Sequence, residues 1–226
     1  HDHDKIKSFC DENGILYIND AAQSQFALYN GINSLELGDT VSMSFADNKS
    51  IPVSGTFGAM LTDDTHVYHR MRHLRKNGKA TREEQFKMPG YSSHPDEQFA
   101  VSILASWKHF EKWQSRKIQI GNMYDDAFAD KVRARPSPAY STWNGHKYAI
   151  MVQDKHKTYD ALLAQGIQTE KHYVDSFSKL DFTPVSNNNF PMSDAFVQQS
   201  LTLPNNPHMT DQEVEKVIAQ VLFSCT

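Results

Sequence analysis

Polar residues that directly follow a short apolar run constrain this chain more than any other feature. Residues 4–12 have a helical pattern ended by Gly14, residues 15–18 are apolar, and Asn19 and Asp20 follow at once. A helix, a compact buried strand and a polar residue at the strand's carboxyl end form the repeating unit of parallel α/β sheets. We therefore expect such a sheet, with Asp20 at the edge beyond which these sheets bind ligands.

The rest of the chain continues this pattern and then changes character. We expect strands over residues 40–45, 57–61 and 148–152, and helices over residues 66–76, 96–130, 155–165 and 211–223. Thr210 and Glu213 form a capping box before the last helix. Residues 77–93 are polar and should form a long loop. The pattern predicts an α/β sheet in the first third of the chain and a smaller α+β domain, led by a long helix, in the remainder.

Composition excludes several other classes of protein. Of the 226 residues, 39% are hydrophobic and 22% charged, which is typical of a folded globular chain. The net charge of −4 gives no basic surplus for nucleic acid, and no apolar run is long enough to span a membrane. With only two cysteines, we expect no disulfide framework, no metal site and a reducing compartment, the cytoplasm. Because the chain starts at His1 without Met, we expect a truncated, processed or partial sequence.

Lys49 is the first candidate for chemistry. It lies five residues after Ser44, in a turn that directly follows the strand expected over residues 40–45. A lysine held at a strand end and partly buried loses solvation, so its neutral amine becomes available. A lysine that forms a Schiff base needs that neutral amine. A solvated surface lysine is the alternative.

Asp20 and Gln23 are the second candidates, in the sequence Asp-Ala-Ala-Gln-Ser. Small residues after the carboxylate would let a flat ring approach the backbone. In pyridoxal-phosphate (PLP) enzymes an acidic partner keeps the pyridine nitrogen protonated. Gln23 could donate a hydrogen bond to the phenolic oxygen of the ring. Alternatively, Asp20 caps the following segment and Gln23 is a surface residue.

Four motifs occur in one order along the first third of the chain. They are Asp-Ala-Ala-Gln-Ser from Asp20, Gly38-Asp39, Ser-Phe-x-x-x-Lys from Ser44 to Lys49, and Gly55-x-x-Gly58-Ala59. Together they resemble the DegT/DnrJ-type sugar aminotransferase family, and weaker similarity continues to residues 201–210. The resemblance implies the PLP-dependent transferase fold type I: a partial three-layer α/β/α large domain followed by a small α+β C-terminal domain. Residues 1–90 would be the C-terminal part of the PLP-binding large domain, and residues 91–226 the linking helix and small domain.

The resemblance also implies an activity. Members of the family transfer an amino group from glutamate to a keto nucleotide sugar, with pyridoxal 5'-phosphate as cofactor and pyridoxamine phosphate in the half-reaction, to make amino sugars for polysaccharides or glycosides. Lys49 would form the internal aldimine and move the proton. Asp20 would pair with the pyridinium nitrogen, Gln23 would contact the ring and its oxygen, and Ser44 would bind the phosphate.

Two more positions come from the resemblance alone. The family usually forms homodimers with active sites at the interface, and Ser92 stands where an Asn often reaches the partner's phosphate. His172 and Tyr173 stand where a His-Tyr-Pro segment often lies near the sugar, although Val174 replaces the proline.

The chain also departs from the family pattern. Thr56 and Phe57 bring bulk to a Gly-rich stretch, and Asp47 adds a negative charge near Lys49. The upstream region that completes the phosphate site in the family does not precede these motifs here. Two alternatives therefore stay open: a PLP-dependent sugar dehydratase, which usually has histidine in place of Lys49, and a non-catalytic or split-enzyme fragment acting in assembly or binding.

Overall fold

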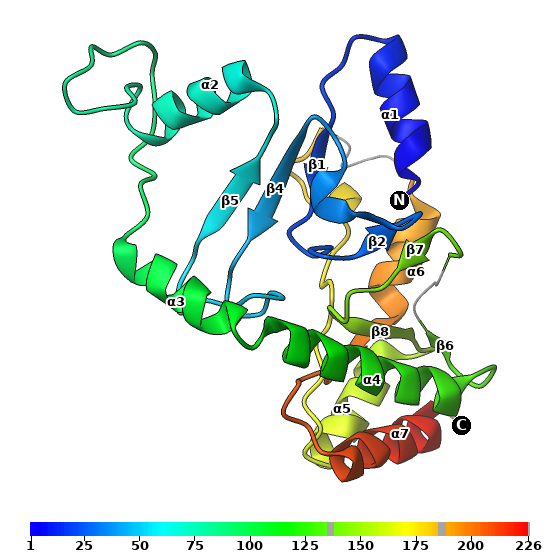
Figure 1. Cartoon of the computed structure of the whole chain (residues 1–226). Helices are drawn as coiled ribbons and strands as arrows, with labels where there is room; N and C mark the ends of the chain where they lie inside the picture. The colour runs from blue at the N-terminus through cyan, green and yellow to red at the C-terminus, as the bar shows by residue number, and fades with distance from the viewer. Residues whose placement is uncertain (135–137, 185–188, 226) are drawn as a thin grey trace. The chain divides into compact units, whose positions relative to one another are not determined.

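The computed structural model describes residues 1–134, 138–184 and 189–225, and it divides the chain into two compact units (Figure 1). Unit 1 comprises His1–Lys112 and Pro138–Asn144, and unit 2 comprises Trp113–Ser137 and Gly145–Thr226. This division rests on the compactness of the backbone. The domain boundary expected after residue 90 rests on the family's architecture and stays a prediction.

Unit 1 is built on a three-stranded sheet in the order β1–β4–β5. Its elements are α1 (His3–Glu12), β1 (Ile18–Asp20), β2 (Leu28–Tyr29), β3 (Ile32–Asn33), the 3-10 helix η1 (Ser34–Glu36), β4 (Thr40–Ser44), β5 (Gly58–Leu61), α2 (Thr65–Arg75), α3 (Glu97–Trp107) and β7 (Ser141–Thr142). Strands β1 and β4 are parallel, as predicted, with Asp20 opposite Ser42. Strand β5 pairs antiparallel to β4, because the short connection between them contains no crossover helix.

The prediction that residues 15–18 are a buried strand is wrong in this unit. Strand β1 begins only at Ile18, and the side chains alternate between a covered and an open face. Tyr17 and Asn19 are buried, whereas Leu16 is 72% exposed and Ile18 is 61% exposed. The open face of the strand and the residues before it therefore carry Leu16 and Ile18, with Asp20 at its end, and nothing in the described part of the chain covers them.

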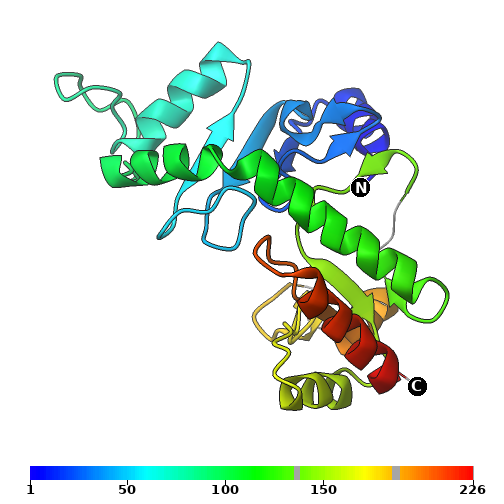
Figure 2. The same ribbon diagram turned by 60° about the horizontal axis from the view of Figure 1, so that its bottom comes forward.

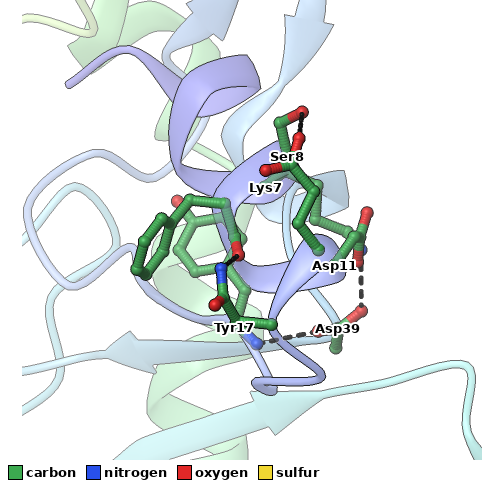
Figure 3. A network of polar contacts seen from close by, with 8 residues as sticks. Lys7, Ser8, Asp11, Tyr17 and Asp39 are labelled. Atoms are coloured by element: carbon green, nitrogen blue, oxygen red, sulfur yellow. Dashed lines mark hydrogen bonds and ion pairs between the residues drawn. The ribbon is translucent and has the colours of Figure 1, made fainter.

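A polar network joins α1 to the start of β1 (Figure 3). Asp39 Oδ2 accepts a hydrogen bond from the Tyr17 backbone N–H at 2.8 Å, and Asp39 Oδ1 lies 3.4 Å from Lys7 Nζ. Lys7 also pairs with Asp11 on its own helix. At Gly38, with φ of +92°, a side chain would come within 3.1 Å of the Tyr17 carbonyl. The Gly38-Asp39 motif therefore holds β1 against β4.

Residues 96–130 form two helices rather than the single helix predicted. Helix α3 ends at Trp107, and α4 (Phe110–Phe128) begins after two intervening residues. At the junction the His109 N–H donates to the Ser106 carbonyl at 3.0 Å, a tighter i→i+3 bond that ends the α-helical pattern. The Ser106 hydroxyl meanwhile donates to the Pro52 carbonyl at 2.7 Å, which ties the junction to the loop after β4.

Unit 2 contains an antiparallel sheet in the order β6–β8–β9. Its elements are β6 (Arg133–Ala134), β8 (Tyr148–Met151), α5 (Lys155–Ala164), the 3-10 helix η2 (Phe177–Lys179), α6 (Pro191–Gln199), β9 (Ser200–Leu203) and α7 (Asp211–Cys225), together with most of α4. Tyr124 of α4 is fully buried against Tyr148 of β8, with ring centroids 4.9 Å apart. Figure 2 shows α4 and α7 side by side, where Arg116 pairs with Asp211 at 2.7 Å.

The strand and the two helices predicted over residues 148–223 are confirmed to within two residues. The capping box is also confirmed, since the Thr210 N–H donates to Glu213 Oε2 at 2.8 Å and the Glu213 N–H donates to Thr210 Oγ1 at 3.3 Å. In the three described stretches of chain, no helix is both long and apolar enough to cross a membrane.

Candidate active site

The carboxyl ends of the parallel strands β1 and β4 bring the first candidates together. Asp20 is the last residue of β1, and its Oδ1 accepts hydrogen bonds from the Ser42 hydroxyl and the Ala22 N–H, both at 3.0 Å. Asp20 therefore does cap the following segment, as the alternative interpretation held. The side chain is nevertheless exposed, and among the described residues no donor is bonded to Oδ2.

The loop after β4 fixes the position of Lys49 in the chain. Phe45, Ile51 and Val53 are buried in one cluster and anchor the loop on both sides of the lysine. The Val53 N–H donates to the Phe45 carbonyl at 2.9 Å, and the Lys49 N–H donates to the Ala46 carbonyl at 2.9 Å. The apolar residues thus explain why a tight polar turn protrudes here.

The Lys49 side chain is half-buried. Within the part of the chain that the structure describes, its ammonium group makes no hydrogen bond or ion pair. Asp47, the nearest acidic residue in the sequence, is exposed and makes no ion pair with it. The backbone that carries Lys49 is therefore anchored, while its amine has no protein partner among the described residues.

Ser44 and Gln23 flank these two residues. Ser44 is half-buried at the end of β4, and its Oγ accepts a weak hydrogen bond from the Ala46 N–H at 3.4 Å. The Gln23 side chain is exposed, while its backbone carbonyl accepts a hydrogen bond from Asn144 Nδ2 at 3.1 Å. A carboxylate and a hydroxyl therefore lie at the ends of two neighbouring strands, and an amide and an amine lie in the segments that follow these strands.

Ser92 does not join this group through its own contacts. It is exposed and forms an isolated β-bridge with Lys76, just after α2. No hydrogen bond links Ser92 to Asp20, Ser44 or Lys49 in the described stretches of chain.

His172 and Tyr173 lie in unit 2. His172 Nδ1 is 3.1 Å from Thr202 Oγ1 and 3.4 Å from Glu170 Oε2. Burial, followed by the positive charge of Lys147, lowers the pKa of His172 below its ordinary value, and the Glu170 carboxylate opposes this only in part. The imidazole is therefore mainly neutral at pH 7, and the Tyr173 side chain is 53% exposed beside it.

Three residues absent from the sequence-based prediction hold these candidates in place. Gln25 and Asn144 are bonded to the segments that carry Gln23 and Ser44, and Lys155 donates to the Tyr173 carbonyl at 3.0 Å. All three are buried polar side chains. Only Gln25 lies beside a recognised motif, and nothing in the sequence pattern distinguishes the other two.

Solved structures with the same fold are aminotransferases. A DegT DnrJ EryC1 StrS aminotransferase from Brucella abortus superposes with a TM-score of 0.93 at 22% identity, covering 100% of this chain and 61% of that chain. A Streptococcus pneumoniae protein described as a sugar aminotransferase, solved in its PLP form, gives a TM-score of 0.87 at 19% identity and covers 100% and 65% respectively. These likenesses confirm the predicted fold class, that of PLP-dependent aminotransferases.

The chain belongs to the DegT/DnrJ/EryC1/StrS aminotransferase family, whose sequence profile matches residues 1–222. It is 24% identical over 227 residues to the erythromycin biosynthesis sensory transduction protein EryC1 of Saccharopolyspora erythraea, covering 96% of this chain and 61% of the relative. It is 26% identical over 227 residues to the dTDP-3-amino-3,4,6-trideoxy-alpha-D-glucose transaminase of Streptomyces venezuelae, covering 97% and 59%. The chain therefore spans 59–61% of the length of these relatives.

Proposed function

We propose that the protein containing this chain is a PLP-dependent aminotransferase that transfers an amino group from glutamate to a keto nucleotide sugar. The observation that carries the proposal is Lys49, an amine without a protein partner in a turn anchored directly after β4. Relatives named as transaminases of dTDP-linked and UDP-linked sugars support the substrate class.

The chemistry of the side chains fits the cofactor. PLP presents an aldehyde, a pyridine nitrogen and a phosphate, for which an amine, a carboxylate and a hydroxyl are suitable partners. Lys49, Asp20 and Ser44 supply these three groups at the ends of two neighbouring strands. Asp20 Oδ2, which has no donor among the described residues, is the oxygen we assign to the ring nitrogen.

Each residue then has a defined task. When bound, PLP supplies an electron sink for the pair left as a proton leaves the substrate carbon. Lys49 Nζ, when neutral, accepts the proton from Cα of glutamate and, in the second half-reaction, returns one to the sugar carbon that gains the amino group. Asp20 would keep the ring nitrogen protonated, Ser44 would donate its hydroxyl hydrogen to the phosphate, and Gln23 would donate to the ring oxygen. Overall, glutamate and the keto sugar would become 2-oxoglutarate and the amino sugar; the carbonyl oxygen of the sugar leaves as water, and water supplies the carbonyl oxygen of 2-oxoglutarate, so the equation balances.

The sugar substrate would meet His172 and Tyr173. A mainly neutral imidazole can donate to or accept from a sugar hydroxyl without placing a charge beside it. The exposed Tyr173 ring offers an apolar face with a polar tip, which suits a sugar ring.

The location of the protein in the cytoplasm stays a prediction.

Trapping the cofactor on the full-length protein tests the proposal. Protein incubated with PLP should turn yellow, and borohydride reduction should leave a phosphopyridoxyl group on the peptide that contains Lys49. Lys49→Ala and Lys49→Arg should abolish transfer from glutamate, whereas Lys157→Arg, on the exposed face of α5, should behave as wild type. An unlabelled Lys49 peptide, or wild-type rates in both Lys49 variants, would refute the assignment and favour the non-catalytic alternative.

We further propose a homodimer in which Ser92 of one subunit faces the cofactor phosphate bound by the other. The position of Ser92 in the family pattern supports this, and among the described residues Ser92 makes no bond to the site residues of its own chain. In mixed dimers of Lys49→Ala and Ser92→Ala subunits, one site has both wild-type residues. Such dimers should regain activity and PLP affinity that neither variant has alone, and no regain would place the function of Ser92 elsewhere.

A further inference from the structure

A buried glutamine joins the two strand ends that carry the candidate site. Gln25 is 1% exposed, and its Nε2 donates to the Ser44 carbonyl at 2.5 Å. This one side chain therefore connects the segment after β1, which bears Asp20 and Gln23, to the last residue of β4. The backbone bonds between β1 and β4 stop earlier among the described residues: the ladder ends with Asp20 opposite Ser42, and the Ala21 N–H donates to the Ser42 carbonyl at 2.9 Å.

Forming this bond leaves the other end of the Gln25 amide without a hydrogen-bond partner among the described residues. Because two carbonyl oxygens would repel each other, Nε2 must face Ser44, and Gln25 Oε1 is then buried without a partner among the described residues. An unsatisfied buried acceptor costs free energy, so stability by itself does not account for a glutamine at this position. The arrangement therefore indicates a positional role for Gln25.

Asn144, the last residue of unit 1 in the sequence, also bonds to this segment. It is 5% exposed, and its Nδ2 donates to the Gln23 carbonyl at 3.1 Å and to the Gln25 carbonyl at 2.9 Å. Phe26, which follows Gln25, has a φ of +62°, a value that non-glycine residues rarely adopt. Residues 23–26 therefore form an irregular turn outside any helix or strand. Asn144 holds the two carbonyls of this irregular turn.

We propose that Gln25 and Asn144 are positioning residues for the cofactor: Gln25 places Ser44 against the phosphate, and Asn144 places Gln23 against the ring. The inference rests on the proposed function. Both side chains act through backbone carbonyls: Gln25 holds that of Ser44, and Asn144 holds those of Gln23 and Gln25. Gln25 therefore acts on recognition of the phosphate, and Asn144 acts on the environment of the ring.

The dissociation constant for pyridoxal, divided by that for PLP, measures how much the phosphate contributes to binding. A residue that positions Ser44 should lower this ratio when it is replaced, whereas a purely structural residue should not. Both constants are measured on the full-length apoprotein by fluorescence titration. Gln25→Met, which keeps the length of the side chain but lacks a donor, should reduce the ratio about tenfold, as should Ser44→Ala. The double variant should lose no more than Ser44→Ala alone, because both act on one contact. If Gln25→Met does not fold, Gln25→Asn withdraws the amide from Ser44 by one methylene and gives the same comparison.

Asn144→Leu should instead shift the absorption maximum of the bound cofactor, and it should reduce the ratio less than Gln25→Met does, because Asn144 holds Gln25 only by its backbone carbonyl. Leu162→Ala, in the core of unit 2, is the matched control, since it lowers stability without contacting these residues and should change neither quantity. Suppose that the wild-type protein binds PLP. An unchanged ratio in Gln25→Met, or additive losses in the double variant, would then overturn the positioning role and leave the proposed function standing. Wild-type protein that binds no PLP would overturn the proposed function as well.

Discussion

Replacing Asp39 by alanine tests whether one carboxylate holds α1 and β1 in place against β4. Asp39 accepts a hydrogen bond from the Tyr17 N–H at 2.8 Å and lies 3.4 Å from Lys7 Nζ. A hydrogen bond that involves a charged group contributes about 1.5–3 kcal/mol. An ion pair between side chains as exposed as these, at 32% and 35%, contributes about 0–1 kcal/mol. The backbone bond dominates, so Asp39→Ala should lower the free energy of unfolding by about 2 kcal/mol.

Two variants divide this effect between its causes. Lys7→Met removes only the ion pairs of the lysine and should lower the free energy of unfolding by about 0.5 kcal/mol. Asp39→Asn keeps an acceptor for the Tyr17 N–H but loses the charge, so its effect should lie between the other two. Equal losses in Lys7→Met and Asp39→Ala would mean that the ion pair, and not the backbone bond, is the main contribution.

The pH dependence gives a second check on Asp39. The Tyr17 N–H, and then Lys7, lower the pKa of the Asp39 carboxyl below its ordinary value of 3.8, although burial opposes them. A folded-state pKa below the unfolded one means that the stabilisation is present above the unfolded pKa and is lost as the pH falls through the folded pKa. Urea unfolding followed by circular dichroism should therefore give a constant difference between wild type and Asp39→Ala from about pH 5 to 7, and a smaller one below about pH 4. A difference that grows on acidification would refute the reasoning.

Two further substitutions test other parts of the chain. Lys155 is 4% exposed and donates to two backbone carbonyls, and burial first, then Lys171, lower its pKa against the opposing charge of Asp175. At a pH between the lowered folded-state pKa and the ordinary value of 10.5, the unfolded chain binds more protons than the folded one. The free energy of unfolding of the wild type should therefore rise with pH in this range. Urea unfolding of Lys155→Met should show no such rise. At Gly78, with φ of +87°, an added Cβ would lie 1.7 Å from the Met88 carbonyl oxygen, so Gly78→Ala must open the loop and should lower the melting temperature. Gly14→Ala, with φ of +64° and nothing within 4 Å of the new Cβ, should lower the free energy of unfolding by only about 1 kcal/mol and the melting temperature less than Gly78→Ala does. Equal decreases in melting temperature in the two variants would contradict the steric argument.

Local patterns were sufficient to predict the elements whose own residues determine them. Strand β4, helix α2 and helix α7 have clear periodicity and start signals, and the Thr210 capping box is a contact between near neighbours in the sequence. The break between α3 and α4 has no such signal, because it depends on Ser106 bonding to Pro52, which is 54 residues away. The exposure of Leu16 and Ile18 was also unpredictable, since an apolar run does not reveal what covers it.

The candidate site divides in the same way. Lys49, Asp20 and Ser44 follow strands, and strand ends in a parallel arrangement meet at one edge, so their association could be predicted from pattern and family resemblance. The residues that hold them in place are different in kind. Asn144 reaches the Gln25 carbonyl across 119 residues, and an asparagine in a loop has no periodicity to indicate its partner.

Gln25 shows why such supporting residues matter for assigning function to a divergent member of a family. The reactive groups of a site can be present in the sequence and still fail if their backbone shifts, since about 1 Å of misplacement can reduce a rate about a hundredfold. In this chain the segment after β1 contains Phe26 in a left-handed conformation, which by itself would destabilise the turn that carries Gln23. The Phe26 ring packs 4.5 Å from Phe110, and the amide of Asn144 binds the carbonyls on either side of Ser24. These contacts compensate the strain of the turn, so under the proposed function they keep Gln23 at the place where the cofactor ring would bind.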